Sequence, residues 1–223
     1  MGRLVLGWTE SLVRQRLLAL GSAWGEPFVT GPWPHPIRIA FENEGASLDE
    51  ALDRLFGGDI LPRGVLSAEE ALLLSARRRQ ATVACAESCT GGLIGGALTS
   101  LAGSSDIFLG SAVCYADGAK KALLSVSDEI LSAKGAVSAE TARAMAAGAR
   151  TLYGSTLALA VTGVAGPGGG SPEKPVGTVW FGVATGEGSG AFLRTFSGFD
   201  RATIRSATVA VGLEALWRTL ERS

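Results

Sequence analysis

Histidine is almost absent from this chain: one of its 223 residues is a histidine, His35. A Ser-His-Asp triad therefore cannot be assembled within the second half of the sequence. The three cysteines, Cys85, Cys89 and Cys114, are an odd number without CxxC spacing and lie far from His35 in sequence. We expect neither a disulfide framework nor a metal site.

Lysine is also scarce, and the net charge is close to zero. Lysine occurs at four positions, all in the second half: Lys120, Lys121, Lys134 and Lys174. Chemistry that needs an amine thus has few candidates. Twenty basic residues against 21 acidic ones give a net charge of -1, so the whole-protein field attracts neither nucleic acid nor an anionic membrane. A small molecule is the expected partner.

Long apolar runs are missing as well. No run approaches the roughly 20 residues that cross a bilayer, and the N-terminus carries an early charge and too short an apolar core for a secretory signal. We expect a cytoplasmic protein. Apolar residues make up 47% of the chain and charged residues 18%, which is typical of a globular protein. Its length predicts two units, residues 1–66 and 67–223.

The first unit reads as a small α+β domain. Its alternating apolar residues predict two strands, and residues suited to N-caps, Thr9 and Ser47, predict the starts of two helices. The expected strands are 3–8 and 36–42, and the expected helices are 9–20 and 47–56. A capping box formed by Ser67 and Glu70 then starts a helix over 67–80, which leads into the second unit.

The second unit alternates short apolar runs, glycine-rich turns and alanine-rich helices, as α/β layered domains do. The expected strands are 81–85, 111–115, 156–162, 177–185 and 191–197. The expected helices are 91–101, 117–124, 138–152 and 201–220. In such folds the loops that follow the carboxyl ends of strands carry function.

The first of these loops is "ACAESCTGG", residues 84–92. Ser88 and Cys89 are possible nucleophiles, and the backbone N–H groups that follow are donors of the kind that stabilise an oxyanion. Alternatively, Ser88 and Thr90 only cap the next helix.

The second loop is "CYADGAKK", residues 114–121, in which Tyr115 and Lys120 could face the same crevice as Ser88. A lysine acts as a base when burial or nearby cations lower its pKa. Alternatively, Lys120 and Lys121 form a solvated pair on a helix surface.

The third loop is "VTGVAGPGGGSPEKPVGTVW", residues 161–180. Its glycines allow the close backbone approach that suits a phosphate or carboxylate cradle, although a flexible surface turn is equally compatible. It has neither a P-loop nor a GxGxxG fingerprint, so ATP and NAD folds are not expected.

The last candidate segment is "GFDRATIR", where Asp200 is expected to cap the final helix. Arg201 and Arg205 fall four residues apart on one face of that helix. They suit phosphate recognition, although exposed helix arginines are ordinary.

Together these stretches resemble one family, the C-terminal domain of the competence-damage-inducible protein CinA, also known as nicotinamide mononucleotide deamidase. The motifs are "AESCTGG", "AGSS", "YADGAK", "GAVSAETARAMAAGAR", "VTGVAGPGGGSPEKPVGTVWFGVA" and "DRATIRSATVAVGLEAL". The resemblance runs from about residue 68 to the end. It implies a three-layer α/β/α sandwich with a mixed sheet.

The resemblance also implies hydrolysis of the carboxamide of nicotinamide mononucleotide, without a metal or cofactor, by a serine and lysine pair. These fall on Ser88 and Lys120. We further expect Tyr115 to steer the lysine or the pyridine ring. The expected substrate site comprises a buried loop orienter, Glu87; oxyanion donors at Thr90, Gly91 and Gly92; pocket residues Thr162, Gly163, Gly166 and Gly168; and, near the phosphate, Arg201 or Arg205.

One segment departs from the family pattern. Members usually have Tyr-Ser-Asn before the lysine, whereas this chain has Tyr115-Ala116-Asp117-Gly118. The negative charge of Asp117 would tend to keep the Lys120 amine protonated. A competing hypothesis is therefore a non-catalytic module that only binds a pyridine nucleotide.

Residues 1 to about 66 resemble, more faintly, the KH-like linker domain of full-length CinA. This segment has no lysine and no GxxG loop in place, so we expect an interdomain contact or a contact within a homo-oligomer and not RNA binding.

Overall fold

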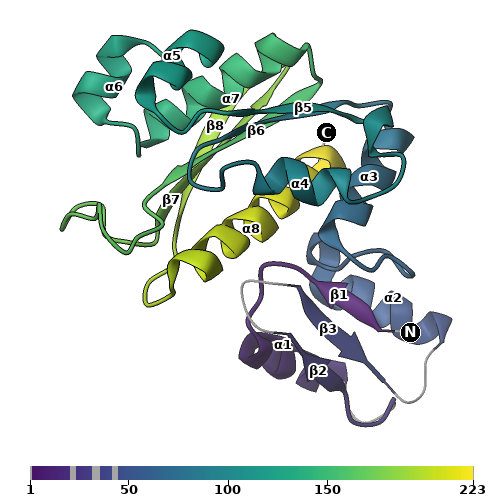
Figure 1. Cartoon of the computed structure of the whole chain (residues 1–223). Helices are drawn as coiled ribbons and strands as arrows, with labels where there is room; N and C mark the ends of the chain where they lie inside the picture. The colour runs from purple at the N-terminus through teal and green to yellow at the C-terminus, as the bar shows by residue number, and fades with distance from the viewer. Residues whose placement is uncertain (1, 21–23, 32–35, 42–44, 223) are drawn as a thin grey trace.

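The computed structural model describes residues 2–20, 24–31, 36–41 and 45–222; His35 lies outside them. The N-terminal part forms an antiparallel sheet in the order β1-β3-β2, with two helices (Figure 1). Its elements are β1 (Arg3–Val5), α1 (Glu10–Leu17), η1 (Leu18–Leu20), β2 (Phe28–Thr30), β3 (Ile37–Ala40), α2 (Ala46–Phe56) and η2 (Gly57–Asp59).

Two details of this part differ from the predictions. Strand β2 was not predicted, because three residues are too few to show an alternating pattern. The predicted cap of α2 at Ser47 is wrong, since the N-cap is Gly45 and Ser47 lies inside the first turn. Thr9 does cap α1, accepting a hydrogen bond from the Leu12 N–H.

The second sheet has five strands in the order β5-β4-β6-β7-β8. Their bounds are β4 (Val83–Glu87), β5 (Phe108–Val113), β6 (Leu157–Gly163), β7 (Thr178–Thr185) and β8 (Gly188–Thr195). Strand β4 pairs in parallel with β5 and β6, whereas β7 pairs antiparallel with β6 and with β8. The mixed sheet is confirmed, with strand bounds shifted by up to three residues.

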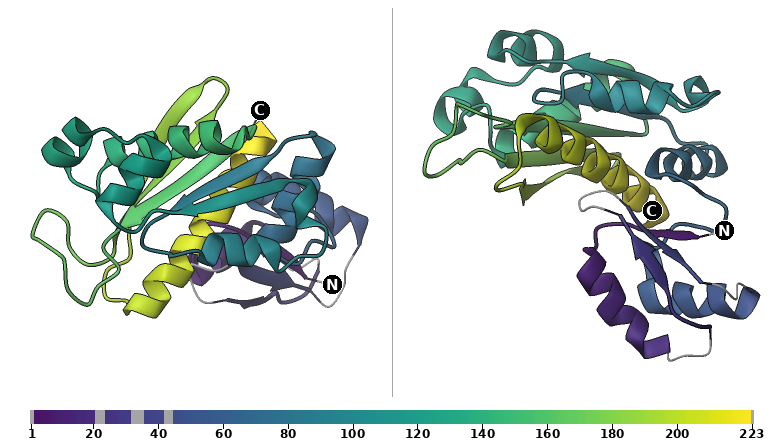
Figure 2. Two further views of the ribbon diagram at one scale, coloured as in Figure 1. Left: turned by 45° about the horizontal axis from the view of Figure 1, so that its top comes forward. Right: turned by 60° about the horizontal axis from the view of Figure 1, so that its bottom comes forward.

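Helices cover both faces of this sheet (Figure 2). One face packs on α3 (Ala68–Arg78), α4 (Leu93–Thr99) and α8 (Arg201–Arg222). The other face packs on α5 (Asp117–Leu124), α6 (Asp128–Lys134) and α7 (Ala139–Tyr153). A 3-10 turn, η3 (Ser104–Asp106), precedes β5. The expected three-layer α/β/α fold is therefore confirmed.

The side chains of β4 divide between the two layers, because successive residues of a strand point to opposite faces. Val83 and Cys85 join the core beneath α8, and Ala84 and Ala86 join the core beneath α7. Alanines on the second face let α7 lie close to the sheet. At Gly182 the approach is so close that a Cβ would lie 2.0 Å from the carbonyl oxygen of Ala142.

The parallel strands β5, β4 and β6 end at the same edge of the sheet. The segments that follow them carry Tyr115, Ser88 and Val164, so the three predicted loops converge there. Among the described residues, no helix is long and apolar enough to span a membrane.

Candidate active site

A cavity of about 280 Å³ lies at this edge of the sheet. Eight of the predicted site residues line it: Ser88, Tyr115, Lys120, Thr162, Gly163, Gly166, Gly168 and Arg201. Residues from the same loops complete the wall, including Cys89, Asp117, Val164, Ala165 and Gly169. Ala136 and Val137 line it as well; they lie in the family motif at residues 135–150 but were not named as site residues, because they follow α6, a short helix that was not predicted.

Ser88 directly follows β4 and is almost fully buried. Its backbone N–H donates to the Val161 carbonyl at 3.0 Å, which fixes it against β6. Gly91 and Gly92 then turn the chain with φ of +61° and +99°, a backbone region that favours glycine. Helix α4 begins after Gly92 without a side-chain cap, so the alternative in which Ser88 and Thr90 cap it is wrong.

Glu87 is fully buried at the end of β4 and holds this loop in place. Its carboxylate accepts four hydrogen bonds of 2.7–3.0 Å, from the Gly92, Ile94 and Gly95 N–H groups and the Ser111 hydroxyl. A carboxylate is favoured at this position, because the N-terminus of α4 presents unpaired N–H groups and the positive end of its dipole. This geometry fits the loop-orienting role expected for Glu87. Glu87 does not line the cavity.

The predicted oxyanion donors are only partly available. Gly91 N–H donates to the Ser88 carbonyl at 3.1 Å, and Gly92 N–H donates to Glu87 at 2.9 Å. The Gly91 and Gly92 N–H groups thus already bond to protein acceptors, so the expectation that they hold an oxyanion is wrong. The Thr90 N–H bonds with the Cys89 thiol, a weaker acceptor than oxygen. The fully buried Thr90 hydroxyl has no partner among the described residues.

Lys120 is 1% exposed, so its amine is not a solvated surface group. Its Nζ donates to the Tyr115 carbonyl at 3.1 Å and to Asp117 Oδ1 at 3.2 Å. The neighbouring Lys121 instead lies on the surface, where it pairs with Asp128 at 2.9 Å. The alternative in which Lys120 and Lys121 form a solvated pair on the helix surface is therefore wrong for Lys120. The predicted proximity of Asp117 to Lys120 is confirmed.

The rival nucleophile Cys89 is held as a neutral thiol. Burial raises the pKa of its thiol to about 12, and the charge of Glu87 adds to this effect. Hydrogen bonds from the Cys89 and Thr90 backbone and the charge of Arg205 lower the pKa only in part. Because a thiolate is the reactive form of cysteine, Cys89 is a poor nucleophile near neutral pH.

The two arginines at the start of α8 have different positions. Arg201 lines the cavity, where its guanidinium donates to the Gly166 carbonyl at 2.7 Å and to the Tyr115 hydroxyl at 3.3 Å. Arg205 donates to the carbonyls of Cys89 at 3.1 Å and Thr90 at 2.7 Å. Arg205 therefore holds the Ser88 loop from outside the cavity. The predicted cap of α8 at Asp200 is confirmed by its bond from Thr203 N–H.

The third loop closes the remaining side of the cavity. Thr162 donates its hydroxyl to the Ala136 carbonyl at 2.7 Å, which ties β6 to the segment before α7. Gly166 has a φ of +77°, and a Cβ there would lie 2.6 Å from Val176. Lys174, farther along, donates to the Lys134 carbonyl at 2.8 Å. These contacts hold the start and the end of the loop against its neighbours.

Comparison with known proteins supports the assignment of the fold. The family model described as the CinA C-terminal domain matches residues 66–220. The chain belongs to the CinA family. The solved competence/damage-inducible protein CihA of Agrobacterium tumefaciens is 42% identical, with a TM-score of 0.66 over 69% of this chain and 95% of that one. A CinA superfamily protein from Enterobacter cloacae is 31% identical, with a TM-score of 0.65 over 71% and 95%.

Curated CinA-like proteins align with the same region. One from Geobacter metallireducens is 55% identical over 62% of this chain and 33% of its own length. One from Salinibacter ruber is 44% identical over 79% of this chain and 43% of its own length. The chain thus spans less than half the length of these CinA-like relatives. Among the described residues of its CinA domain and N-terminal part, no three His, Cys, Asp or Glu side chains cluster as metal ligands.

Proposed function

We propose that this protein hydrolyses the carboxamide of nicotinamide mononucleotide to nicotinic acid mononucleotide and ammonia, in pyridine nucleotide salvage. The observation that carries the proposal is the meeting of Ser88 and the buried amine of Lys120 in one cavity. No histidine occurs in the CinA-like region to serve as the base. A serine and lysine pair is a known variant of the triad.

The first half-reaction forms an ester on Ser88. Lys120, in its neutral amine form, accepts the proton of the Ser88 hydroxyl, and Oγ attacks the amide carbon. The tetrahedral intermediate then collapses as the C–N bond breaks. The lysine returns its proton to the departing nitrogen, so ammonia leaves and the amine is neutral again.

The second half-reaction hydrolyses that ester. Lys120 takes a proton from water, the resulting hydroxide attacks the ester carbonyl, and Ser88 recovers its proton as the acid product leaves. The Tyr115 carbonyl holds Nζ at 3.1 Å and so fixes its position during both steps. Of the predicted oxyanion donors, Thr90 N–H is the one not bound to an oxygen acceptor.

Arg201 is the residue we assign to the substrate phosphate. Two of its nitrogens are used by Gly166 and Tyr115, and a guanidinium carries five N–H donors, so further donors remain. Thr162, Gly163, Gly166 and Gly168 would line the nucleotide. Arg205 and Glu87 would act through the Ser88 loop and not on the substrate.

The ion pair of Lys120 with Asp117 favours a second candidate, a module that binds a pyridine nucleotide without turnover. An amine held as ammonium cannot take the proton of Ser88. The carboxylate is 56% exposed, so water screens its charge and the pair is weaker than a buried one. This is why we rank catalysis first.

Ammonia release separates the two candidates. Purified wild type, Ser88→Ala and Lys120→Ala are incubated with nicotinamide mononucleotide in the presence of a chelator, and Lys121→Ala serves as the matched lysine control. We expect release from the wild type and the control and a loss of at least about a hundredfold in the other two. Binding of the nucleotide by the wild type without any release would support the module instead.

We also propose that the protein acts in the cytoplasm as a homo-oligomer, on a small nucleotide, without a nucleic-acid or membrane partner. The balanced charge of the chain supports the absence of a nucleic-acid or anionic membrane partner. The N-terminal part, residues 1–66, would then serve as a contact domain beside the catalytic domain, residues 67–223.

A further inference from the structure

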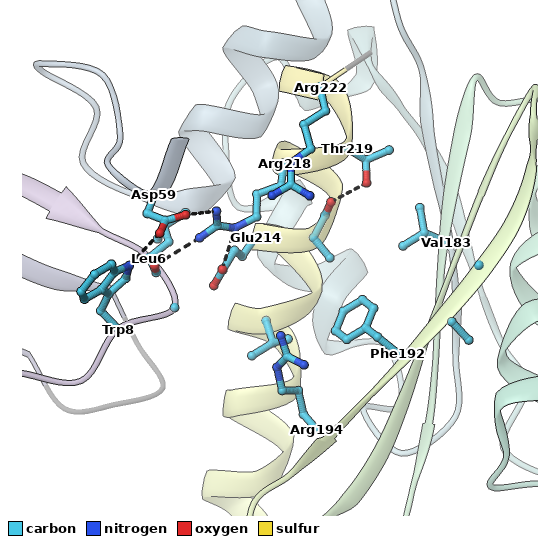
Figure 3. Close-up of a pocket in the computed structure, with 15 residues that line it drawn as sticks. Leu6, Trp8, Asp59, Val183, Phe192, Arg194, Glu214, Arg218, Thr219 and Arg222 are labelled. Atoms are coloured by element: carbon cyan, nitrogen blue, oxygen red, sulfur yellow. Dashed lines mark hydrogen bonds and ion pairs between the residues drawn. The ribbon is translucent and has the colours of Figure 1, made fainter. Parts of the chain in front are cut away.

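A second cavity, of about 590 Å³, lies between the N-terminal part and the CinA domain (Figure 3). Trp8 and Asp59 line it from the N-terminal part, and β8 and the C-terminal half of α8 line it from the CinA domain. It shares no lining residue with the Ser88 cavity. Its volume is in the range of small-molecule sites, which occur preferentially at domain interfaces.

One arginine of this cavity is already neutralised. Arg218 binds both Asp59 and Glu214, the latter at 2.8 Å, and donates to the carbonyls of Leu6 and Gly58. Four of the five N–H donors of Arg218 are thus used by the protein. It is 18% exposed and ties the two parts of the chain together.

Two other arginines of the cavity have no such partner. Arg194 and Arg222 line it, and neither pairs with a carboxylate of the described residues. The lining carries three arginines against Asp59 and Glu214, so it has one more positive than negative charge. Arg218 carries one positive charge against these two carboxylates, and the charge of Arg194 also acts on Glu214, so Arg194 and Arg222 together supply the surplus of one positive charge.

The wall beside these arginines is flat and apolar. Phe192 stacks on Phe181, with ring centroids 4.9 Å apart and an interplanar angle of 5°. The Arg194 guanidinium lies 5.0 Å from the Phe192 ring, which keeps this charge beside the apolar surface. Val183 and Val211 extend that surface. Figure 3 shows Arg194 and Phe192 below, and Arg222 above, the Arg218–Glu214 pair.

We propose that this interdomain cavity binds a small organic anion with a flat apolar body, which lies along the apolar wall that includes Phe192, Val183 and Val211 and whose charge is balanced by Arg194 and Arg222. Guanidinium groups bind carboxylates and phosphates through paired N–H donors. Both an aromatic carboxylate and an aromatic phosphate ester have the required chemistry. The residues proposed to bind the anion lie in the CinA domain, and Trp8 and Asp59 of the N-terminal part form the facing side of the cavity, so the full chain is the form to be tested.

Calorimetric titration of the full chain with benzoate and phenyl phosphate tests the proposal. Two partial probes serve as controls: inorganic phosphate, which lacks the ring, and benzyl alcohol, which lacks the charge. We expect at least one of the two aromatic anions to bind at low salt, more tightly than both partial probes. Whichever of benzoate and phenyl phosphate binds better identifies the charged group preferred.

Variants locate the bound probe. Arg194→Gln and Arg222→Gln are expected to weaken binding about fivefold each, as for an exposed ion pair. Arg54→Gln removes an exposed arginine on α2, outside the cavity, and should leave affinity unchanged. Thermal melts establish that each variant is folded.

Three results would overturn the proposal: no binding of either aromatic anion at millimolar concentration, unchanged affinity in the Arg194→Gln and Arg222→Gln variants, or loss of binding confined to Arg201→Gln, which would place the probe in the Ser88 cavity. The titration needs no turnover. A negative outcome therefore leaves the proposed deamidation untouched, and loss of ammonia release would not affect this cavity.

Discussion

At the scale of the residue, the arrangement around Lys120 decides the chemistry of this site. The side chain is buried, and its amine contacts two oxygens, the Tyr115 carbonyl and Asp117 Oδ1. The Tyr115 carbonyl positions the amine, and the Asp117 carboxylate holds it in an ion pair. Whether Lys120 is available to act as the base therefore depends on Asp117.

Asp117→Asn removes the carboxylate that accepts a hydrogen bond from Lys120 Nζ at 3.2 Å. Because the amine is then released from this ion pair, we expect kcat/KM to rise about two- to fivefold, the range of an exposed ion pair. Asp128→Asn, which removes the partner of Lys121, is the matched control. An unchanged or lower kcat/KM would show that Asp117 does not restrain Lys120.

Cys89 supplies a test based on its raised pKa. With a pKa of about 12, roughly one thiol in ten thousand is ionised at pH 8, because each unit below the pKa reduces the thiolate tenfold. Iodoacetamide at pH 8 should therefore leave activity intact for hours, and Cys89→Ser should retain the larger part of it. Rapid inactivation that Cys89→Ser abolishes would contradict the assignment of a neutral thiol.

At the scale of the element, local signals predicted most of the fold. Caps at Thr9 and Ser67 each accept the expected backbone hydrogen bond, and five apolar runs predicted the five strands of the second sheet. Helix α6 was missed, although Ser127 caps it. Seven residues carry too little apolar periodicity to distinguish a helix from a loop.

The site elements were predicted to converge, but their internal contacts were not. Glu87 was expected to be a buried loop orienter, but its donors, which come from the start of α4 and from Ser111 on β5, were not predicted. Likewise, Arg201 and Arg205 lie four residues apart on one helix face, and this spacing did not predict that Arg201 lines the cavity while Arg205 holds the Ser88 loop. Such roles depend on tertiary packing, which spacing alone does not encode.

The packing of α7 on β7 depends on one missing side chain. A Cβ at Gly182 would lie 2.0 Å from the Ala142 carbonyl, and both groups belong to backbone that cannot rotate away. We expect Gly182→Ala to lower the free energy of unfolding by about 2–3 kcal/mol, as overpacked cores do. Urea unfolding measures this. Gly190→Ala on β8, where a Cβ meets nothing within 4 Å, is the control, and equal effects would disprove the close approach.

At the scale of the whole molecule, α8 connects the two cavities. Its first turns carry Arg201 and Arg205, which contact the Ser88 site, and its last turns carry Arg218, which contacts the N-terminal part. The last contact joins residues more than 200 positions apart, Arg218 and Leu6, which is why no local pattern predicted it.

Arg218→Ala should loosen the N-terminal part. It leaves Asp59 and Glu214 without their cation, and Glu214 is only 16% exposed. The lost charged hydrogen bonds lower the free energy of unfolding by about 2 kcal/mol. We expect a lower urea midpoint and faster proteolysis within residues 1–66. Arg54→Ala on the surface of α2 is the control. A midpoint equal to that of the control would show that Arg218 does not hold the two parts together.

The central claim is that Ser88 forms a covalent ester with the substrate. The most direct measurement is peptide mass spectrometry after acid quench of the protein during turnover of nicotinamide mononucleotide. We predict an acyl adduct on Ser88 within the peptide that contains residues 84–92, absent in Ser88→Ala. An adduct on Cys89, or ammonia release at the wild-type rate by Ser88→Ala, would contradict the account.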